Sequence, residues 1–198
     1  MIVAEATVTL HFPDTIKFGL VSRKPAAMVL LERNDKTLDV ALVDKTGLVF
    51  LLGEKSWDYI DQGKVPVISG LSPGVIQLGS QLPVRIEKLL SNLYQIQESD
   101  QILIDLISEI RLVPIGSSAE NILSDIGNGF DLLIYPVGFQ IPLRFREIVS
   151  STQLSKAFFL LDAITSDHQE ERLTNIAEID FRSGPPVALF QRGIPSGE

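Results

Sequence analysis

The sequence predicts an α+β fold, because the two halves of the chain carry different hydrophobic periodicities. In the first half, short runs of alternating apolar and polar residues are separated by turns, which is typical of antiparallel strands. In the second half, segments with helical spacing alternate with strand-like runs. The chain has 198 residues, of which 45% are hydrophobic, so it can form one large domain or two small ones with a packed core.

A β-hairpin is predicted at the start of the chain. Residues 4–12 place apolar side chains at every second position, and the same alternation returns in residues 16–22. Residues 13–15, Pro-Asp-Thr, are a typical turn, since Pro presets φ and Asp can close an Asx-turn. Pro25 ends the pairing because it has no N–H to donate to a strand ladder.

A meander is predicted next, with strands at residues 27–32, 39–43 and 48–52. Gly47 belongs to the second of its turns, at a position that needs a positive φ. Residues 53–79 contain five Gly and the only Trp, and predict an irregular crossing segment that ends in the run 65–70.

The second half is expected to alternate helices with strands. Leucine and isoleucine at helical spacing predict an amphipathic helix at residues 81–97, and Ser151 is expected to cap a second long helix. The other expected elements, in order, are a short helix from residue 102 that leads into a strand at 108–115, a hairpin of residues 130–135 and 139–145, and closing strands at 176–182 and 187–191.

The composition excludes several kinds of chemistry. The chain has no Cys, which excludes disulfides, thiolate nucleophiles and iron–sulfur clusters, and its two His cannot form a histidine-rich metal site. A net charge of −8 disfavours a nucleic-acid partner. No apolar run reaches the roughly 18 residues of a membrane span, and neither a metal nor a cofactor is expected.

Two local patterns are candidates for catalysis, and each has a simpler interpretation. Residues 70–74 match the G-x-S-x-G pattern of hydrolases, but Pro73 follows Ser72 and has no N–H for an oxyanion hole. Asp58 and Asp61 flank aromatic residues, but two acids in an irregular loop are usually solvated turn residues. His11 and His168 are interpreted as surface residues. We therefore expect no enzymatic activity, and a hydrolase that uses Ser72 or the Asp58/Asp61 pair is the weakest of three hypotheses.

The last predicted strand suggests a binding function. Val187, Ala188, Leu189 and Phe190 are apolar on both faces of this strand. An apolar strand at a sheet edge needs a cover, and a partner chain added as a further strand can supply one. The alternative is that the strand is paired inside the sheet. Four arginines near it form either a basic patch or a solvated face: Arg144, Arg146, Arg182 and Arg192.

Several motifs, in order along the chain, resemble those of one family, the extracytoplasmic part of the bacterial cell-division proteins FtsQ and DivIB. Residues 6–16 are similar to its A-x-V-x-x-x-F-P-x-T hairpin, and residues 22–27 to its E-R-x-P-V-A segment. Three later segments resemble its L-V-D-x-x-G-x-V-F turn, its L-P-x-x-x-G stretch and its V-D-L-R…S-G-x-x-V strand pair: residues 42–50, 65–70 and 179–187.

The resemblance implies a bent, mostly antiparallel sheet with two or three helices on one side, preceded by a POTRA-like β-hairpin. Residues 1–26 would be the C-terminal hairpin of a truncated POTRA-like domain, and residues 27–198 an FtsQ-type β domain. It also implies a location at the periplasmic face of the inner membrane, with one upstream helix anchoring the full-length protein.

The function implied by the resemblance is that of a non-enzymatic divisome scaffold. It would bind FtsB-like and FtsL-like partners, and with them other divisome members, by strand addition, and so regulate septal peptidoglycan synthesis; no small-molecule substrate is implied. The implied partner-binding residues are Arg144, Phe181, Arg182, Ser183, Gly184, Val187, Ala188, Leu189 and Phe190, with the two arginines facing acidic partner residues. The second hypothesis is a POTRA-like interaction module of another envelope assembly, for outer-membrane protein insertion or secretion.

Overall fold

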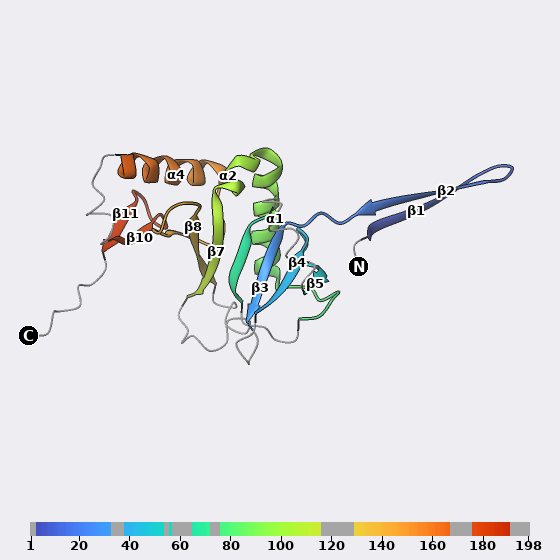
Figure 1. The fold of residues 1–198 in the computed structure, drawn as a ribbon, viewed down its shortest axis with the longest axis horizontal. Helices are drawn as coiled ribbons and strands as arrows, with labels where there is room; N and C mark the ends of the chain where they lie inside the picture. The colour runs from blue at the N-terminus through green and yellow to red at the C-terminus, as the bar shows by residue number, and fades with distance from the viewer. Residues whose placement is uncertain are drawn as a thin grey trace, which may run out of the picture.

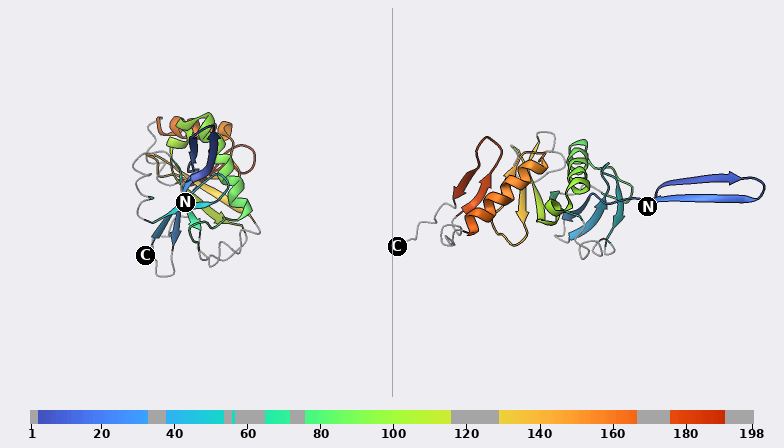
Figure 2. Two further views of the ribbon diagram at one scale, coloured as in Figure 1. Left: turned by 90° about the vertical axis from the view of Figure 1, so that its right-hand side faces the viewer. Right: turned by 90° about the horizontal axis from the view of Figure 1, so that it is seen from above.

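The structure, a computed structural model, describes residues 3–32, 38–53, 56, 65–71, 76–115, 129–166 and 176–190. These residues form a nine-stranded mixed sheet that carries three helices, and a separate two-stranded hairpin that projects away from it (Figures 1 and 2). The predicted α+β class is confirmed.

The large sheet has the strand order β11-β10-β9-β8-β7-β6-β3-β4-β5. Neighbouring strands are antiparallel except at three junctions, β3–β6, β6–β7 and β9–β10, which are parallel. The strands are β3 (Ala27–Glu32), β4 (Leu38–Val43), β5 (Val49–Leu52), β6 (Val67–Leu71), β7 (Ile107–Pro114), β8 (Phe130–Pro136), β9 (Leu143–Phe145), β10 (Ile176–Asp180) and β11 (Val187–Phe190).

The three described helices cover one face of this sheet (Figure 2). They are α1 (Val84–Ser99), the short α2 (Gln101–Asp105) and α4 (Ser151–Ser166). The amphipathic pattern of α1 explains its position, because its five buried residues lie on one side of the helix: Ile86, Leu89, Leu90, Leu93 and Ile96. Together with the apolar side chains that the strands present to the helices, they form the main core. A smaller buried cluster belongs to β3, β4 and β5: Met28, Val40, Leu42 and Phe50.

The segment expected to be an irregular crossing contains a central strand. β6 lies between β3 and β7 and is parallel to both. Gly70 makes this pairing possible, because it adopts a φ of +82° and a Cβ atom there would lie 2.5 Å from the backbone oxygen of Leu112 in β7. Only glycine tolerates both the positive φ and this close approach.

The cap of α4 differs by one residue from the expected one. The backbone N–H of Gln153 donates to the hydroxyl of Ser150, and the backbone N–H of Ser150 donates to the side-chain oxygen of Gln153. This reciprocal arrangement is a capping box, so Ser150 is the N-cap, and Ser151 is the first helical residue. Ser150 and Ser151 have the same side chain, but Gln153 lies three residues after Ser150, which is the spacing that a capping box requires.

The N-terminal hairpin consists of β1 (Val3–His11) and β2 (Thr15–Ser22), as the alternation predicts. Arg23 follows β2 and contacts the sheet, where its guanidinium lies 2.5 Å from the Asp44 carboxylate. Asp44 also accepts hydrogen bonds from Thr46 and from the backbone N–H of Leu48, which close the turn at Gly47 with its φ of +79°. Burial acts to raise the pKa of Asp44, but these hydrogen bonds outweigh it and hold the pKa below its ordinary value.

Candidate functional site

Strand β11 is one edge of the nine-stranded sheet (Figure 1). It pairs on one side with β10, where Ala188 lies opposite the buried Ile179 and Leu189 lies opposite Glu178. All four of its residues are exposed, and Phe190 retains 65% of its accessible surface. An edge strand presents a row of unpaired N–H and C=O groups, so β11 offers both backbone and apolar side chains to a further strand. The sequence left open whether this strand lies at a sheet edge or is paired inside the sheet, and the structure places it at the edge.

An apolar groove of about 490 Å³ lies between α4 and the turn that leads into β11. Phe159 and Leu160 of α4 line one side of it, and Phe181 and Pro186 line the other. Phe159 is 75% exposed, which is unusual for a large aromatic side chain on a helix that also packs on a sheet. The groove adjoins the start of β11, so one ligand could occupy both.

The Phe181 ring fixes the position of this turn. It stacks on Phe145 of β9, with the ring centroids 5.1 Å apart and the planes 14° from parallel. Phe145 is fully buried, so the stack joins the turn to the main core. An aromatic pair of this kind contributes about 0.5–1.5 kcal/mol beyond the burial of its area.

Arg144 and Arg182 are brought together on the sheet face opposite the helices. Both donate to the same carboxylate oxygen of Asp131 in β8, at 3.3 Å from Arg144 and 2.5 Å from Arg182. Arg144 also forms a bidentate pair with Glu178, with distances of 2.7 and 2.8 Å. Arg182 likewise donates to both carboxylate oxygens of Asp180, the closest contact being 2.6 Å.

These contacts give the cluster three carboxylates and two guanidinium groups. The hydrogen bonds to Glu178 raise the pKa of Arg144, and those to Asp180 raise the pKa of Arg182. The hydrogen bond from Arg182 lowers the pKa of Asp180, which burial alone would raise. Every nitrogen atom of the two guanidinium groups already has an acidic neighbour. The cluster therefore ties β8, β9 and β10 together and is not a free basic patch.

The remaining predicted site residues fall into three groups. Ser183 and Gly184 lie exposed in the turn before β11, where Gly184 has a φ of +67°. Arg146 is exposed next to β9, and His11 is exposed on β1. The other candidates lie outside the described residues: Ser72, Asp58, Asp61, His168 and Arg192.

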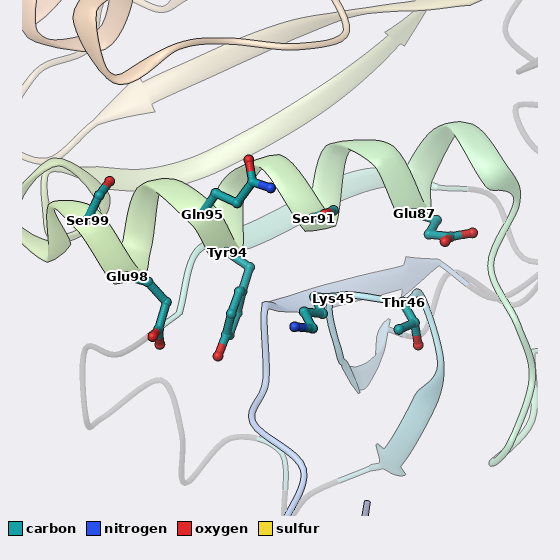
Figure 3. Close-up of a pocket in the computed structure, with 8 residues that line it drawn as sticks. All are labelled: Lys45, Thr46, Glu87, Ser91, Tyr94, Gln95, Glu98 and Ser99. Atoms are coloured by element: carbon teal, nitrogen blue, oxygen red, sulfur yellow. The ribbon is translucent and has the colours of Figure 1, made fainter.

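A second surface groove, of about 500 Å³, lies between the turn at Lys45 and helix α1 (Figure 3). The ammonium group of Lys45 is 5.1 Å from the centre of the Tyr94 ring, which is within the range of a cation–π contact. Glu87 in the first turn of α1 and Glu98 in its last turn line the same groove. In the part of the chain that the structure describes, no group of His, Cys, Asp or Glu is arranged to hold a metal ion.

Sequence reasoning missed several residues of the site. Asp131 is a charged residue within an apolar run, and only 3% of its surface is exposed. Because a buried charge needs a partner, this position could have been recognised from the sequence. Phe159 lies outside the apolar stripe of its helix, and this departure from the period indicated exposure. Glu178 and Asp180 could not be recognised from the sequence. Alternation within a strand predicts the sheet face on which a residue lies, but not which residue of a neighbouring strand it contacts.

In the comparisons with known proteins, neither a protein-family model nor a curated protein matches the chain. None of the helices in the described residues has the length and apolar character needed to span a membrane.

Proposed function

We propose that this chain is a non-enzymatic scaffold that binds a partner protein by strand addition at β11. The exposed β11 edge carries this proposal, because its free backbone groups and apolar side chains lie beside the groove at Phe159. In strand addition, backbone hydrogen bonds supply affinity and pockets for alternate side chains supply specificity. In this proposal the β11 edge supplies the backbone hydrogen bonds, and the groove supplies one pocket for a partner side chain.

The proposed partners are FtsB-like and FtsL-like division proteins, as the resemblance to FtsQ and DivIB implies. In this proposal the domain works at the periplasmic face of the inner membrane, held there by an upstream helix of the full-length protein, and regulates septal peptidoglycan synthesis. Because the cluster around Asp131 neutralises Arg144 and Arg182, the proposal assigns most of the affinity to the strand and the groove. The two arginines mainly hold β10 in place.

Proline substitutions in β11 test the strand contact. Neighbouring N–H groups of an edge strand point alternately toward β10 and toward solvent, so Ala188→Pro and Leu189→Pro together remove one group of each kind. We expect one of the two variants to keep its fold by circular dichroism and to bind a synthetic FtsB-like peptide at least about tenfold more weakly in calorimetry. Leu189→Thr, which keeps the N–H, is the matched control. If a folded proline variant of the outward position binds with unchanged affinity, strand addition is wrong.

The groove is tested separately with Phe159→Ala. Phe159 is largely exposed, so its loss should leave the midpoint of thermal unfolding nearly unchanged while peptide affinity falls about tenfold. Phe158→Ala is an unsuitable control because that side chain is half-buried and packs on the core; Lys156→Ala, on the rim of the groove, is the better one. Equal affinity for both variants and the parent chain would remove the groove from the proposal.

The alternative, a POTRA-like module of another envelope assembly, makes a different prediction. It requires tandem POTRA domains or a β-barrel in the full-length gene product, whereas the divisome proposal requires one upstream membrane span. Binding of an FtsB-like peptide at β11 would favour the divisome proposal.

A further inference from the structure

The groove between α1 and the turn at Lys45 is separate from the β11 edge (Figure 3). Its walls belong to α1 and to the turn between β4 and β5, and β5 is the edge of the sheet opposite to β11. Its volume of about 500 Å³ lies within the range of roughly 300–1,000 Å³ that is typical of ligand sites. A partner bound at β11 would therefore leave this groove open.

One wall of the groove is a row of polar side chains on α1. Glu87, Ser91 and Gln95 follow one another at intervals of four residues, so they lie on one face of the helix, about 6 Å apart along its axis. In the described part of the chain, these three side chains have no hydrogen-bond or ion-pair partner. The carboxylate accepts hydrogen bonds, and the hydroxyl and the amide both donate and accept them, so the whole row is available to a ligand.

The spacing of this row fits an extended polypeptide. In an extended segment, every second residue directs its backbone N–H and C=O to the same side, so these groups repeat at about 6.6–6.8 Å. Over the two intervals of the row the difference in length is about 1.5 Å, which the long side chains of Glu87 and Gln95 can accommodate. A helical ligand fits less well, because its backbone groups are already hydrogen-bonded within the helix.

The charges in the groove favour a basic ligand. Glu98 lies 3.5 Å from Lys24, and the ammonium group of Lys45 lies over the Tyr94 ring, so each of these charges has a favourable neighbour. Glu87 is half-buried, and no cation of the described residues pairs with it. A Lys or Arg side chain of the ligand can supply this cation, and such a pair also fixes the register of the ligand in the groove.

We propose that this groove binds an extended segment of a partner protein, with a Lys or Arg side chain of that segment paired to Glu87. The backbone of the segment runs along α1 and exchanges hydrogen bonds with Ser91 and Gln95. The Tyr94 ring is half-buried and packs on the main core, so it gives a fixed apolar contact to a neighbouring side chain of the segment. This site does not depend on the proposed function of β11.

Amide chemical shifts of the ¹⁵N-labelled chain test the site with the peptide Ac-Thr-Val-Lys-Val-Thr-NH₂, whose β-branched residues favour an extended backbone. We expect shifts in α1 and in residues 44–47, with a dissociation constant in the millimolar range. The same peptide with Gln in place of Lys should bind about three- to fivefold more weakly, because it lacks the ion pair. Equal binding of the two peptides, or no shifts in the groove at about 10 mM peptide, would overturn the proposal.

Variants of the groove separate the ion pair from the backbone contacts. Glu87→Gln should remove the preference for the Lys peptide, whereas Ser91→Ala should weaken both peptides by a similar factor of about two or more. Asp162→Asn removes an exposed carboxylate on α4, outside the groove, and is the matched control. If Glu87→Gln keeps the full preference for the Lys peptide, the ligand cation binds elsewhere and the assignment is wrong.

An extended peptide can also pair with the β11 edge, and the position of the shifts separates the two sites. Shifts in α1 that persist in Leu189→Pro support the groove, whatever happens at β11. Shifts confined to β10 and β11 and abolished by Leu189→Pro would overturn the groove as the binding site, while they would support strand addition.

Transferred nuclear Overhauser effects test the conformation of the bound peptide. Strong contacts between the Hα of one residue and the amide proton of the next are expected for an extended backbone. Strong contacts between successive amide protons, which a helix produces, would contradict the proposed match to the row on α1.

Discussion

Two hairpins stand at opposite ends of this molecule, and they differ in what holds them. The β1–β2 hairpin has long strands, and just after β2 the side chains of Arg23 and Lys24 form ion pairs with Asp44 and with Glu98 of α1. The β10–β11 hairpin is shorter, and it joins β9 through a parallel ladder in which only Ile179 and Asp180 are in register. It is nevertheless integrated, because the Asp131 cluster and the stacked Phe181 reach across to the neighbouring strands.

The comparison shows that attachment to the core and pairing within a hairpin are separate properties. Regular hydrogen bonding keeps two strands together but gives them no apolar layer to pack on, so β1–β2 remains an exposed ribbon. In β10–β11 the backbone ladder to β9 is short, but side chains that contact neighbouring strands fix the position of the hairpin. This difference suits the proposed role of β11 as a positioned binding edge.

The largest effect on the contrast between the two hairpins is expected from removing the carboxylate that Arg144 and Arg182 share. Asp131→Ala leaves Arg144 and Arg182 without their common acceptor, and we expect a loss of about 2–3 kcal/mol in the free energy of unfolding. Hydrogen exchange should show faster exchange in β10 and β11 than in β3 and β4. The control is Asp162→Ala, an exposed carboxylate on α4. Unchanged exchange in β10 would mean that the cluster does not hold this hairpin.

Acidification should weaken the attachment of the C-terminal hairpin to the sheet. Because Arg182 holds the pKa of Asp180 below its ordinary value, the carboxylate contributes stability above the unfolded pKa of about 3.9, and this contribution is lost as the pH falls through the folded value. The pKa of Asp44 is also lowered, so the stability that its carboxylate contributes is likewise lost as the pH falls. Amide chemical shifts of β10 and β11, followed by NMR from pH 6 to about pH 2, should therefore move together with the Asp180 carboxyl signal. A titration of these amides centred above pH 4 would contradict the assignment, since a lowered pKa cannot produce it.

Deleting residues 1–22 should have the smallest effect on the sheet. The deleted ribbon does not pack on the core and Arg23 is retained, so the free energy of unfolding should change by less than about 0.5 kcal/mol in urea titrations. A large loss of stability would show that the ribbon is coupled to the sheet and that the two hairpins are more alike than their contacts indicate.

The sequence predicted the elements of this fold better than their arrangement. Alternation defines β1 and β2 within a residue or two, and helical spacing defines α1, because both signals are local. Neither signal could place β6 between β3 and β7, since its partners are remote in sequence and its run was broken by Gly70. The candidate site follows the same division: the apolar character of β11 was readable, whereas the ion cluster depends on three strands meeting at Asp131.

The position of β6 has a consequence for how the molecule folds. Its two neighbours, β3 and β7, both reach it through crossover connections, and Met28 and Ile110 are among the residues they pair with it. Such long-range pairings form late, because the loop entropy must be lost before the contact stabilises anything. The strands on either side of β6 can form local hairpins early, but they become one sheet only when β6 is inserted. We therefore expect the two halves of the sheet to gain their stability in a single cooperative step.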